Sequence, residues 1–409
     1  MTSSPAPLHG VTVLAVEQYG AGPFGTMLLA DLGARIVKIE NPKGGDVGRV
    51  VGPYFGDDGD SLFFHSFNRN KESVALDLKA PEGKAVFHRL VAGADAVFDN
   101  LRGDLPGTLG LTYADLAPHN ERIVCAHLSA YGREGARKAW PGYDYLMQAE
   151  SGYLSLTGEP DTPPSRFGLS IVDMMTGTVA ALALASAIIG ARQTGKGRDI
   201  DVSLFDTALH NLNYLATWFL DRGHLQGRVS RSGHPSLVPS QLYRTRDAWL
   251  FVMCNKERFW PIFCRLIERA DLATDPRFAS AADRLENRDA LTAELDAVLS
   301  QRDTADWMER LGGQVPVSPV LDVRQALENP FVAERGGIAD FVTDDGGALS
   351  MLRGPIRYEG DAVERAGPRL GRDTAAVLRA SGLSEAEIAN LLAAGIVGQA
   401  PQLGEDAAE

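Results

Sequence analysis

The amino-acid sequence predicts an α/β protein in which a mostly parallel sheet is followed by a second domain. In the first half of the chain, short apolar runs alternate with helical patterns, which is typical of β–α units and a parallel sheet. Residues 221–240 then have the composition of a loop, rich in glycine, serine and proline, and mark a change of domain. The length of 409 residues also exceeds that of a typical single domain.

The first β–α–β unit lies close to the N-terminus. Residues 11–16 form an apolar strand, residues 20–25 a glycine-rich turn, residues 26–32 a helix and residues 35–40 the next strand. A helix over residues 81–92 begins with Pro81, which the first turn of a helix tolerates. Further strands are predicted over residues 74–78, 96–100, 123–129 and 200–204. The carboxyl ends of parallel strands meet at one edge of the sheet, where ligands bind.

The second domain is expected to open with a hairpin. Strands over residues 242–246 and 249–253 are separated by two residues, and amphipathic helices follow as far as residue 310. Residues 315–320 begin the return to the first domain. Near the C-terminus, Ser384 and Glu387 form a candidate capping box, which predicts a helix over residues 384–394.

The composition argues against several classes of function. A net charge of −13 makes a nucleic-acid-binding surface an unfavourable interpretation. Cys125, Cys254 and Cys264 are widely spaced and odd in number, and no histidine pair has metal-ligand spacing, so we expect neither disulfides nor a metal. No nucleophile elbow or P-loop is present. Residues 1–10 show no signal-peptide pattern, so we expect a cytoplasmic protein.

Asp173 stands at the start of a long apolar stretch. A carboxylate removed from water is costly unless something compensates for the loss of hydration. Aspartate is a preferred N-cap residue, so it either caps a helix here, takes part in chemistry, or does both. Residues 174–191 carry no charge, but Thr176 and Gly177 dilute the stretch, so we expect a buried helix and no membrane association.

Gly20, Gly22 and Gly25 match the G-x-G-x-x-G pattern of dinucleotide-binding turns. Glu40, at the end of the next strand, lies at the distance expected of a ribose-binding acid. Pro23 argues against this interpretation, because it removes a backbone N–H from the turn that would receive the phosphates. The alternative is that the glycines let the turn pass close to a neighbouring element.

Many short motifs, in order along nearly the whole chain, resemble the class III (CaiB/BaiF) CoA-transferase family. They include residues 21–24 (AGPF), 32–42 (LGARIVKIENP), 70–79 (NKESVALDLK), 142–144 (GYD), 157–161 (TGEPD), Asp173, 195–198 (GKGR), 233–235 (GHP) and 371–374 (GRDT). The resemblance implies that the glycine-rich turn binds coenzyme A and not a nicotinamide cofactor.

The resemblance also implies an architecture. It predicts a Rossmann-like large domain and a smaller α+β domain, which together form an open ring that interlocks with a second subunit in a homodimer. The first part of the large CoA-binding domain would comprise residues 1–200. Residues 326–409 would be a return linker and the completion of that domain. Residues 201–224 would be a linker helix and residues 225–325 the small domain.

By the same resemblance, Asp173 is the nucleophile of a CoA transferase. A carboxylate is ionised at neutral pH and needs no general base. Its attack on an acyl-CoA thioester yields a mixed anhydride and then an aspartyl-CoA thioester, from which CoA passes to a small carboxylic acid. The site must exclude water, which suits an apolar helix. Coenzyme A enters as acyl-CoA substrate, with no tightly bound cofactor expected.

Further site residues follow from matching positions in the family. The positions expected to contact CoA are Gly20, Ala21, Leu76, Lys79, Asn100, Arg102 and Tyr131. Because Asn41 stands where the family often has arginine, Lys43 or Arg102 is expected to meet the CoA phosphates. The positions expected to contact the substrate are Tyr143, Arg228, Arg231 and His234. The two loop arginines favour a dicarboxylate such as succinate.

Three alternatives remain open from the sequence. An α-methylacyl-CoA racemase shares the fold but uses a histidine in a Gly-His-Asp motif, where this chain has Tyr143, a much weaker base near neutrality. A NAD-dependent oxidoreductase would use the glycine-rich turn and Glu40. A catalytically silent acyl-CoA-binding protein would bind CoA without exchanging it.

Overall fold

The structure is a computed structural model that describes residues 5–359 and 364–400. The chain forms two compact units. The first unit comprises residues up to 151, residues 168–213 and residues from 334 onward, and the second comprises residues 152–167 and 214–333. The extreme ends of the predicted large domain, residues 1–4 and 401–409, lie outside the described residues.

The first unit is built on a seven-stranded sheet with the order β12–β3–β2–β1–β4–β5–β6. Its strands are β1 (Thr12–Val16), β2 (Arg35–Glu40), β3 (Glu72–Leu76), β4 (Ala96–Asp99), β5 (Val124–Ser129), β6 (Arg198–Ser203) and β12 (Val397–Gly398). All neighbours pair in parallel except β12, which runs antiparallel to β3. The predicted α/β fold with a mostly parallel sheet is therefore confirmed, and the order of β1 to β6 is the Rossmann order.

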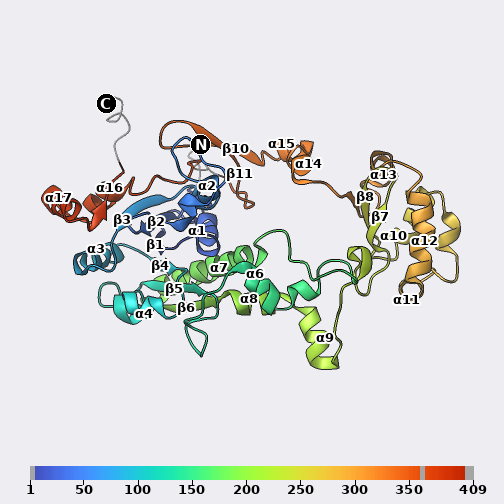
Figure 1. Ribbon diagram of the computed structural model, residues 1–409, viewed down its shortest axis with the longest axis horizontal. Helices are drawn as coiled ribbons and strands as arrows, with labels where there is room; N and C mark the ends of the chain where they lie inside the picture. The colour runs from blue at the N-terminus through green and yellow to red at the C-terminus, as the bar shows by residue number, and fades with distance from the viewer. Residues whose placement is uncertain (1–4, 360–363, 401–409) are drawn as a thin grey trace. The chain divides into compact units, whose positions relative to one another are not determined.

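Helices cover both faces of this sheet (Figure 1). They are α1 (Ala21–Asp31), α2 (Leu62–Asn68), α3 (Pro81–Val91), α4 (Leu105–Leu109), α5 (Tyr113–Leu116), α6 (Asp144–Glu150), α7 (Ile171–Thr194), α8 (Leu204–Asn211), α16 (Thr374–Ala380) and α17 (Glu385–Ala393). One face packs on α3, α5, α16 and α17 in a continuous apolar core, and α1 and α7 pack on the other face. A hairpin of β10 (Ile338–Val342) and β11 (Ala348–Leu352) completes the unit.

Most element boundaries agree with the sequence predictions. β2 has the predicted bounds, and Ser384 caps α17 in a capping box with Glu387, as expected. β3 begins and ends two residues earlier than predicted, because its pairing starts at Glu72 opposite Val37 and the chain turns away after Leu76. The alternation of apolar residues, Val74, Leu76 and Leu78, continues past the end of β3, so the sequence alone did not mark its end.

The glycine-rich segment is part of a helix and not a turn. α1 begins at Ala21, so Gly22 and Gly25 lie within it. A Cβ atom at Gly25 would lie 2.5 Å from the carbonyl oxygen of Gly177, and one at Gly177 would lie 2.4 Å from that of Ala21. These glycines let the backbones of α1 and α7 touch, which is the close approach that glycine permits.

The second unit contains a three-stranded antiparallel sheet, β7–β8–β9. Its elements are α9 (Tyr214–Arg222), β7 (Ser240–Arg244), β8 (Trp249–Met253), α10 (Phe259–Leu266), α11 (Ala281–Glu286), α12 (Arg288–Leu299), α13 (Thr304–Leu311), β9 (Val317–Pro319), α14 (Val323–Leu327) and α15 (Pro330–Glu334), the last ending at the boundary with the first unit. The predicted hairpin is present as β7 and β8, but β7 begins and ends two residues earlier than predicted. Aromatic and aliphatic side chains of the strands and of α10, α12 and α13 form a separate core.

Two segments differ from the sequence-based division of the chain. Residues 201–224, expected to be one linker helix, contain the end of β6 and the two helices α8 and α9. Residues 152–167, placed by sequence with the large domain, belong to the second unit. Hydrogen bonds explain this position, since Arg231 and Arg228 donate to Glu159 and Thr162, which are about seventy residues earlier in the chain.

α7 has 24 residues and is long and apolar enough, by length and composition alone, to cross a membrane. It packs against α1, β5 and β6 of the first unit. One side of it is buried, including Val172, Thr176, Ala180, Leu184 and Ile188, which are spaced four residues apart. The expectation of a buried helix is therefore met on this side only, because Leu182 and Ile189 on α7 are 69% and 59% exposed.

The contact between α1 and α7 can be tested by adding one methyl group. Gly177→Ala is expected to lower the free energy of unfolding by about 1–3 kcal/mol, because the new Cβ meets backbone that cannot move aside easily. Gly190→Ala on the same helix is the matched control, since nothing lies within 4 Å of its Cβ position. Urea unfolding of both variants measures the difference. Equal stability of the two variants would contradict this account of the helix contact.

Candidate active site

A cavity of about 210 Å³ lies at the carboxyl edge of the parallel sheet in the first unit. It opens where the loops after β1 and β4 leave the sheet, the point at which the strand order reverses. Ligands of such sheets bind in the crevice between these diverging loops. The cavity is lined by residues 18–21, 100–102, 128–130 and 140–143, together with Asp173 and Leu204.

The loop after β1 has an unusual backbone that its neighbours hold in place. Tyr19 has a φ of 69°, a left-handed conformation that non-glycine residues rarely adopt. Its amide donates a hydrogen bond of 2.9 Å to Asp46 Oδ1. Asn100 accepts from the Gln18 amide at 2.8 Å and donates to the Gln18 carbonyl oxygen at 2.7 Å. Side chains that follow β2 and β4 therefore fix the loop that lines the cavity.

Beneath this loop lies a buried network of charged side chains. The Lys38 ammonium is 2.8 Å from Asp46 Oδ2 and donates to the Glu17 carbonyl oxygen at 3.1 Å. Lys71 donates to Glu17 Oε1 at 2.7 Å. Burial lowers the pKa of Lys71 to about 8, although the Glu17 carboxylate opposes this shift. Pairing is required here because an uncompensated charge in the interior is strongly destabilising.

Asp173 lies in the first turn of α7 and lines the cavity. The expectation that it is the N-cap is wrong, because α7 begins at Ile171 and Ser170 occupies the N-cap position. The Asp173 amide donates a 2.9 Å hydrogen bond to Asp144 Oδ2, so an acceptor from another helix serves this end of α7. The Asp173 carboxylate faces the loop after β1, where a Cβ at Gly20 would lie 2.9 Å from Asp173 Oδ2.

The electrostatic surroundings of Asp173 are unfavourable for a negative charge. Burial and then the charge of Asp144 raise the pKa of Asp173 to about 7. Among the described residues, no arginine or lysine forms an ion pair with it, in contrast to the paired carboxylates beneath the neighbouring loop. A titratable group with a strongly shifted pKa in a cleft is a candidate for function.

Several predicted site residues line the same cavity as Asp173. They are Gly20, Ala21, Asn100, Arg102 and Tyr143. Arg102 forms an ion pair with Asp104 at 2.6 Å on the surface. To bind a phosphate, Arg102 would have to give up this ion pair with Asp104. Tyr143 is 63% exposed and its ring packs edge-on against that of Tyr19.

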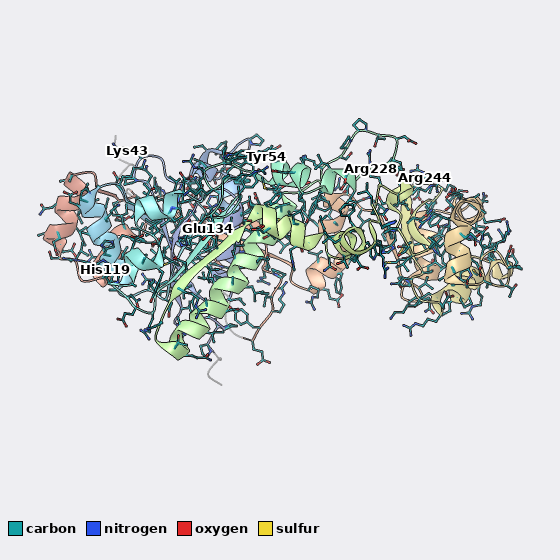
Figure 2. All side chains as sticks on the ribbon, turned by 90° about the horizontal axis from the view of Figure 1, so that it is seen from below. Lys43, Tyr54, His119, Glu134, Arg228 and Arg244 are labelled. Atoms are coloured by element: carbon teal, nitrogen blue, oxygen red, sulfur yellow. The ribbon has the colours of Figure 1, made fainter. Side chains whose placement is uncertain are left out.

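Other predicted CoA contacts do not line the cavity. Leu76 is 2% exposed and packs in the apolar core of the sheet, because its side chain points toward α3 and α16. Lys79 and Lys43 are exposed in turns that follow β3 and β2, and Lys43 is labelled in Figure 2. Tyr131 donates a hydrogen bond to Glu150 at 2.7 Å and packs against Trp140, which does line the cavity.

The predicted substrate residues Arg228, Arg231 and His234 lie in the second unit. Arg228, labelled in Figure 2, donates to the carbonyl oxygens of residues 162 and 163 and has no carboxylate partner among the residues that the structure describes. Arg231 is paired with Asp296 at 2.7 Å. His234 Nδ1 accepts hydrogen bonds from the amides of residues 236 and 237. Of the two arginines, Arg228 is the one without a partner of opposite charge in the described part of the chain.

The structure does not support a dinucleotide site at the glycine-rich segment. Glu40 is buried, and Arg49 donates to both of its carboxylate oxygens, at 2.9 and 2.7 Å. Ser73 donates to it as well, at 2.6 Å, so no oxygen remains directed at a ribose. Gly22 faces Asn100, since a Cβ atom there would lie 2.7 Å from the Asn100 Cβ. These residues serve the packing of the fold.

Gln18, Tyr19 and Trp140 are among the cavity residues that were not singled out from the sequence. Gln18 and Tyr19 follow β1, and their position at a strand end was the signal that could have found them. Trp140 lies in the irregular segment before α6, where no local pattern predicted a role. Within residues 5–359 and 364–400, no group of three or more histidine, cysteine, aspartate or glutamate side chains has the arrangement of a metal site.

The raised pKa of Asp173 predicts a pH-dependent gain in stability for Asp173→Asn. The carboxyl has a pKa of about 3.9 in the unfolded chain and about 7 in the fold. Between these values the native state holds a proton that the unfolded state has lost, so wild-type stability falls as the pH rises toward 7. Asparagine does not titrate, so the variant does not lose this stability as the pH rises. Its stabilising effect relative to the wild type is therefore expected to be larger at about pH 8.5 than at about pH 5.5.

Urea unfolding at both pH values measures the effect. Asp289→Asn, exposed on α12, serves as the control and is expected to change little at either pH. A gain for Asp173→Asn that is the same at both pH values would contradict the raised pKa.

Comparison with known proteins identifies the family. A family model described as CoA-transferase family III matches residues 8–374. An acetyl-CoA:oxalate CoA-transferase of Acetobacter aceti is 37% identical over 386 residues, covering 93% of this chain and 97% of its own length. A succinate–glutarate CoA-transferase of Agrobacterium fabrum is 32% identical, covering 92% of this chain and 96% of its own.

A solved structure agrees with these matches. The crystal structure of a CaiB/BaiF family protein from Brucella suis is 32% identical in sequence and has a TM-score of 0.80, covering 92% of this chain and 100% of its own. This chain therefore belongs to CoA-transferase family III, the class III (CaiB/BaiF) acyl-CoA:carboxylate CoA-transferases.

Proposed function

We propose that this protein transfers CoA from an acyl-CoA to a free carboxylic acid through covalent intermediates on Asp173. The observation that carries the proposal is the carboxylate of Asp173, which lines the cavity at the switch point of the sheet and has no cationic partner among the described residues. An aspartate with a purely structural role would be expected to pair with a cation or to cap its own helix. Asp173 does neither, because Asp144 accepts the hydrogen bond from the helix amide.

The reaction follows from the chemistry of a carboxylate nucleophile. An Asp173 oxygen attacks the thioester carbonyl and expels the CoA thiolate, which leaves a mixed anhydride. The thiolate then attacks the aspartyl carbonyl, releases the first carboxylate and forms an aspartyl-CoA thioester. The acceptor carboxylate attacks this thioester to give a second anhydride and free thiolate. Attack of the thiolate on the acceptor carbonyl gives the new acyl-CoA and restores Asp173, with no net proton change.

CoA is proposed to bind along the carboxyl edge of the sheet. Gly20, Ala21, Asn100 and Arg102 line the cavity with Asp173, which supports their assignment to the thioester end of the substrate. Exposed Lys79 and Lys43 are proposed to meet the phosphates at strand ends β3 and β2. Leu76 would contribute to the CoA site only by its position at the end of β3, because its side chain is buried. Tyr131 would support Trp140, against which it packs.

The proposed assembly is an interlocked homodimer in the cytoplasm, with the first and second units as the large and small domains. Exposed apolar side chains support the proposal that this chain contacts a second subunit. On α9, Phe219 and Leu220 are 54% and 81% exposed, and on α7, Leu182 and Ile189 are 69% and 59% exposed. Apolar side chains this exposed are costly to leave in water when they gather on one helix.

A dicarboxylate is the proposed acid substrate. The relatives named for oxalate and for glutarate act on acids with two carboxylates. A second carboxylate would need a cation, and Arg228 is the better candidate in the second unit because Arg231 is already paired with Asp296. Tyr143 and His234 are proposed to contact the substrate as well. Tyr143 in place of histidine argues against a racemase, since tyrosine is a poor base near neutrality.

The nucleophile is tested by trapping. Incubation of the full chain with succinyl-CoA, followed by hydroxylamine, is expected to yield a hydroxamate on the peptide that contains Asp173, detected by mass spectrometry. Asp173→Ala is expected to abolish trapping and to lower kcat by about a thousandfold or more, because no other carboxylate of the described residues lines the cavity. Asp289→Asn is the matched control and should retain activity.

Full transferase activity in Asp173→Ala would refute the assignment. CoA binding by the wild type without any exchange of acids would favour a silent acyl-CoA-binding protein. Incorporation of deuterium at the α-carbon of a branched acyl-CoA would favour a racemase.

The substrate class is tested with a panel of acids against succinyl-CoA and acetyl-CoA. Dicarboxylates are expected to exchange faster than monocarboxylates of the same length. Arg228→Ala is expected to raise the KM for dicarboxylates about tenfold, the effect of losing one charge-assisted hydrogen bond, and to leave the KM for monocarboxylates unchanged. A monocarboxylate that exchanges as fast as every dicarboxylate tested would contradict this assignment.

A further inference from the structure

We propose that Asp144 is a positioning residue for the transfer reaction, which caps the helix that carries Asp173 and places a second negative charge beside the nucleophile. The proposal rests on the proposed function of Asp173. It concerns a residue that contacts the nucleophile's backbone and is not expected to touch the substrate, since Asp144 is 4% exposed and does not line the cavity.

Asp144 acts as the cap of α7 from outside that helix. The first amides of a helix lack partners within it, and an N-cap side chain usually accepts from one of them. Ser170 occupies the N-cap position, but its side chain makes no capping hydrogen bond. The Asp173 amide donates to Asp144 Oδ2 at 2.9 Å instead. The Asp173 carboxylate therefore does not cap the N-terminus of its own helix.

Asp144 is itself held firmly. It is the first residue of α6, where the helix dipole favours a negative charge. Its Oδ1 accepts a 2.6 Å hydrogen bond from Gln148 Nε2, one turn further along α6. Gln148 Nε2 also donates to the Leu169 carbonyl oxygen at 3.1 Å, which ties α6 to the segment that leads into α7. The position of the charge beside Asp173 is therefore set by two helices.

The charge of Asp144 bears directly on the proposed chemistry. Two neighbouring carboxylates repel each other more strongly in a partly buried site than in water. When Asp173 attacks the thioester, its oxygen becomes part of a neutral anhydride and the negative charge leaves on the CoA thiolate. The repulsion is relieved in the anhydride and in the aspartyl-CoA thioester. Asp144 thus raises the energy of the free nucleophile relative to both intermediates, which favours their formation.

No other described residue at the cavity has the same effect. The cavity that Asp173 lines is formed by the loops after β1 and β4, the end of β5, the segment just before α6, and the start of α8, which contributes Leu204. The other titratable side chains that line the cavity are Tyr19, Tyr143 and Arg102, and Arg102 is paired with Asp104. Burial and then Asp144 account for the raised pKa of Asp173.

Asp144→Asn separates the charge from the cap, because an asparagine oxygen still accepts from the Asp173 amide. The experiment measures kcat/KM against pH with succinyl-CoA and a dicarboxylate acceptor, and the rate of hydroxylamine-trapped enzyme in single turnovers. The acidic limb is expected to move about one pH unit lower. Above that limb the trapping rate is expected to fall up to about tenfold. The Tm is expected to fall less than in Asp144→Ala, because asparagine keeps the acceptor for the Asp173 amide and loses only the acceptor for Gln148.

Two further variants make the outcome decisive. Asp144→Glu keeps the charge and is expected to keep the acidic limb within a few tenths of a pH unit of the wild type. Asp144→Ala removes charge and cap, so a lower Tm is expected in addition to the shifted limb. An acidic limb and a trapping rate unchanged in Asp144→Asn, or shifted equally in the Glu and Asn variants, would overturn the proposal.

These results are distinguishable from failure of the proposed function itself. If Asp173→Ala is inactive while Asp144→Asn behaves as the wild type, only the role of Asp144 is lost. If Asp173→Ala is fully active, both proposals fall together.

Discussion

The contact between the backbones of α1 and α7 is the constraint on which the site depends. Gly25 and Gly177 have no side chain because each faces the other helix at a distance that a Cβ atom would not allow. The contact sets where the first turn of α1 lies relative to the first turn of α7. Gly20 and Asp173 are brought together for that reason, although they are 153 positions apart in the chain.

A second constraint is the buried charge beneath the loop after β1. Lys38 and Lys71 extend from β2 and from the residue before β3 to reach Glu17, and Asp46 joins the network from beyond β2. Asp46 also accepts from Tyr19, whose left-handed backbone costs free energy on its own. Such a conformation persists only where several interactions over-determine it. The network thus supplies rigidity to a loop that lines the cavity.

Asp173 differs from these paired charges in a way that is informative about function. Evidently the fold can compensate a buried carboxylate, since Glu17, Glu40 and Asp46 all have cationic partners. Asp173 has none among the described residues, and the charge that acts on it is that of another carboxylate, Asp144. An unpaired, partly buried charge lowers the stability of the fold. This cost is consistent with a reactive carboxylate that becomes neutral during the reaction.

The sequence by itself determined the parallel sheet, the hairpin of the second unit and the C-terminal capping box, because these depend on local periodicity and on neighbours three or four residues apart. It also singled out Asp173, through motifs that resemble a family. Only the tertiary structure decided that Asp173 is not the cap of its helix, that Glu40 is paired with Arg49, and that the glycine-rich segment is helical. Each of these depends on a partner from another element, and the spacing of residues along one segment carries no information about such a partner.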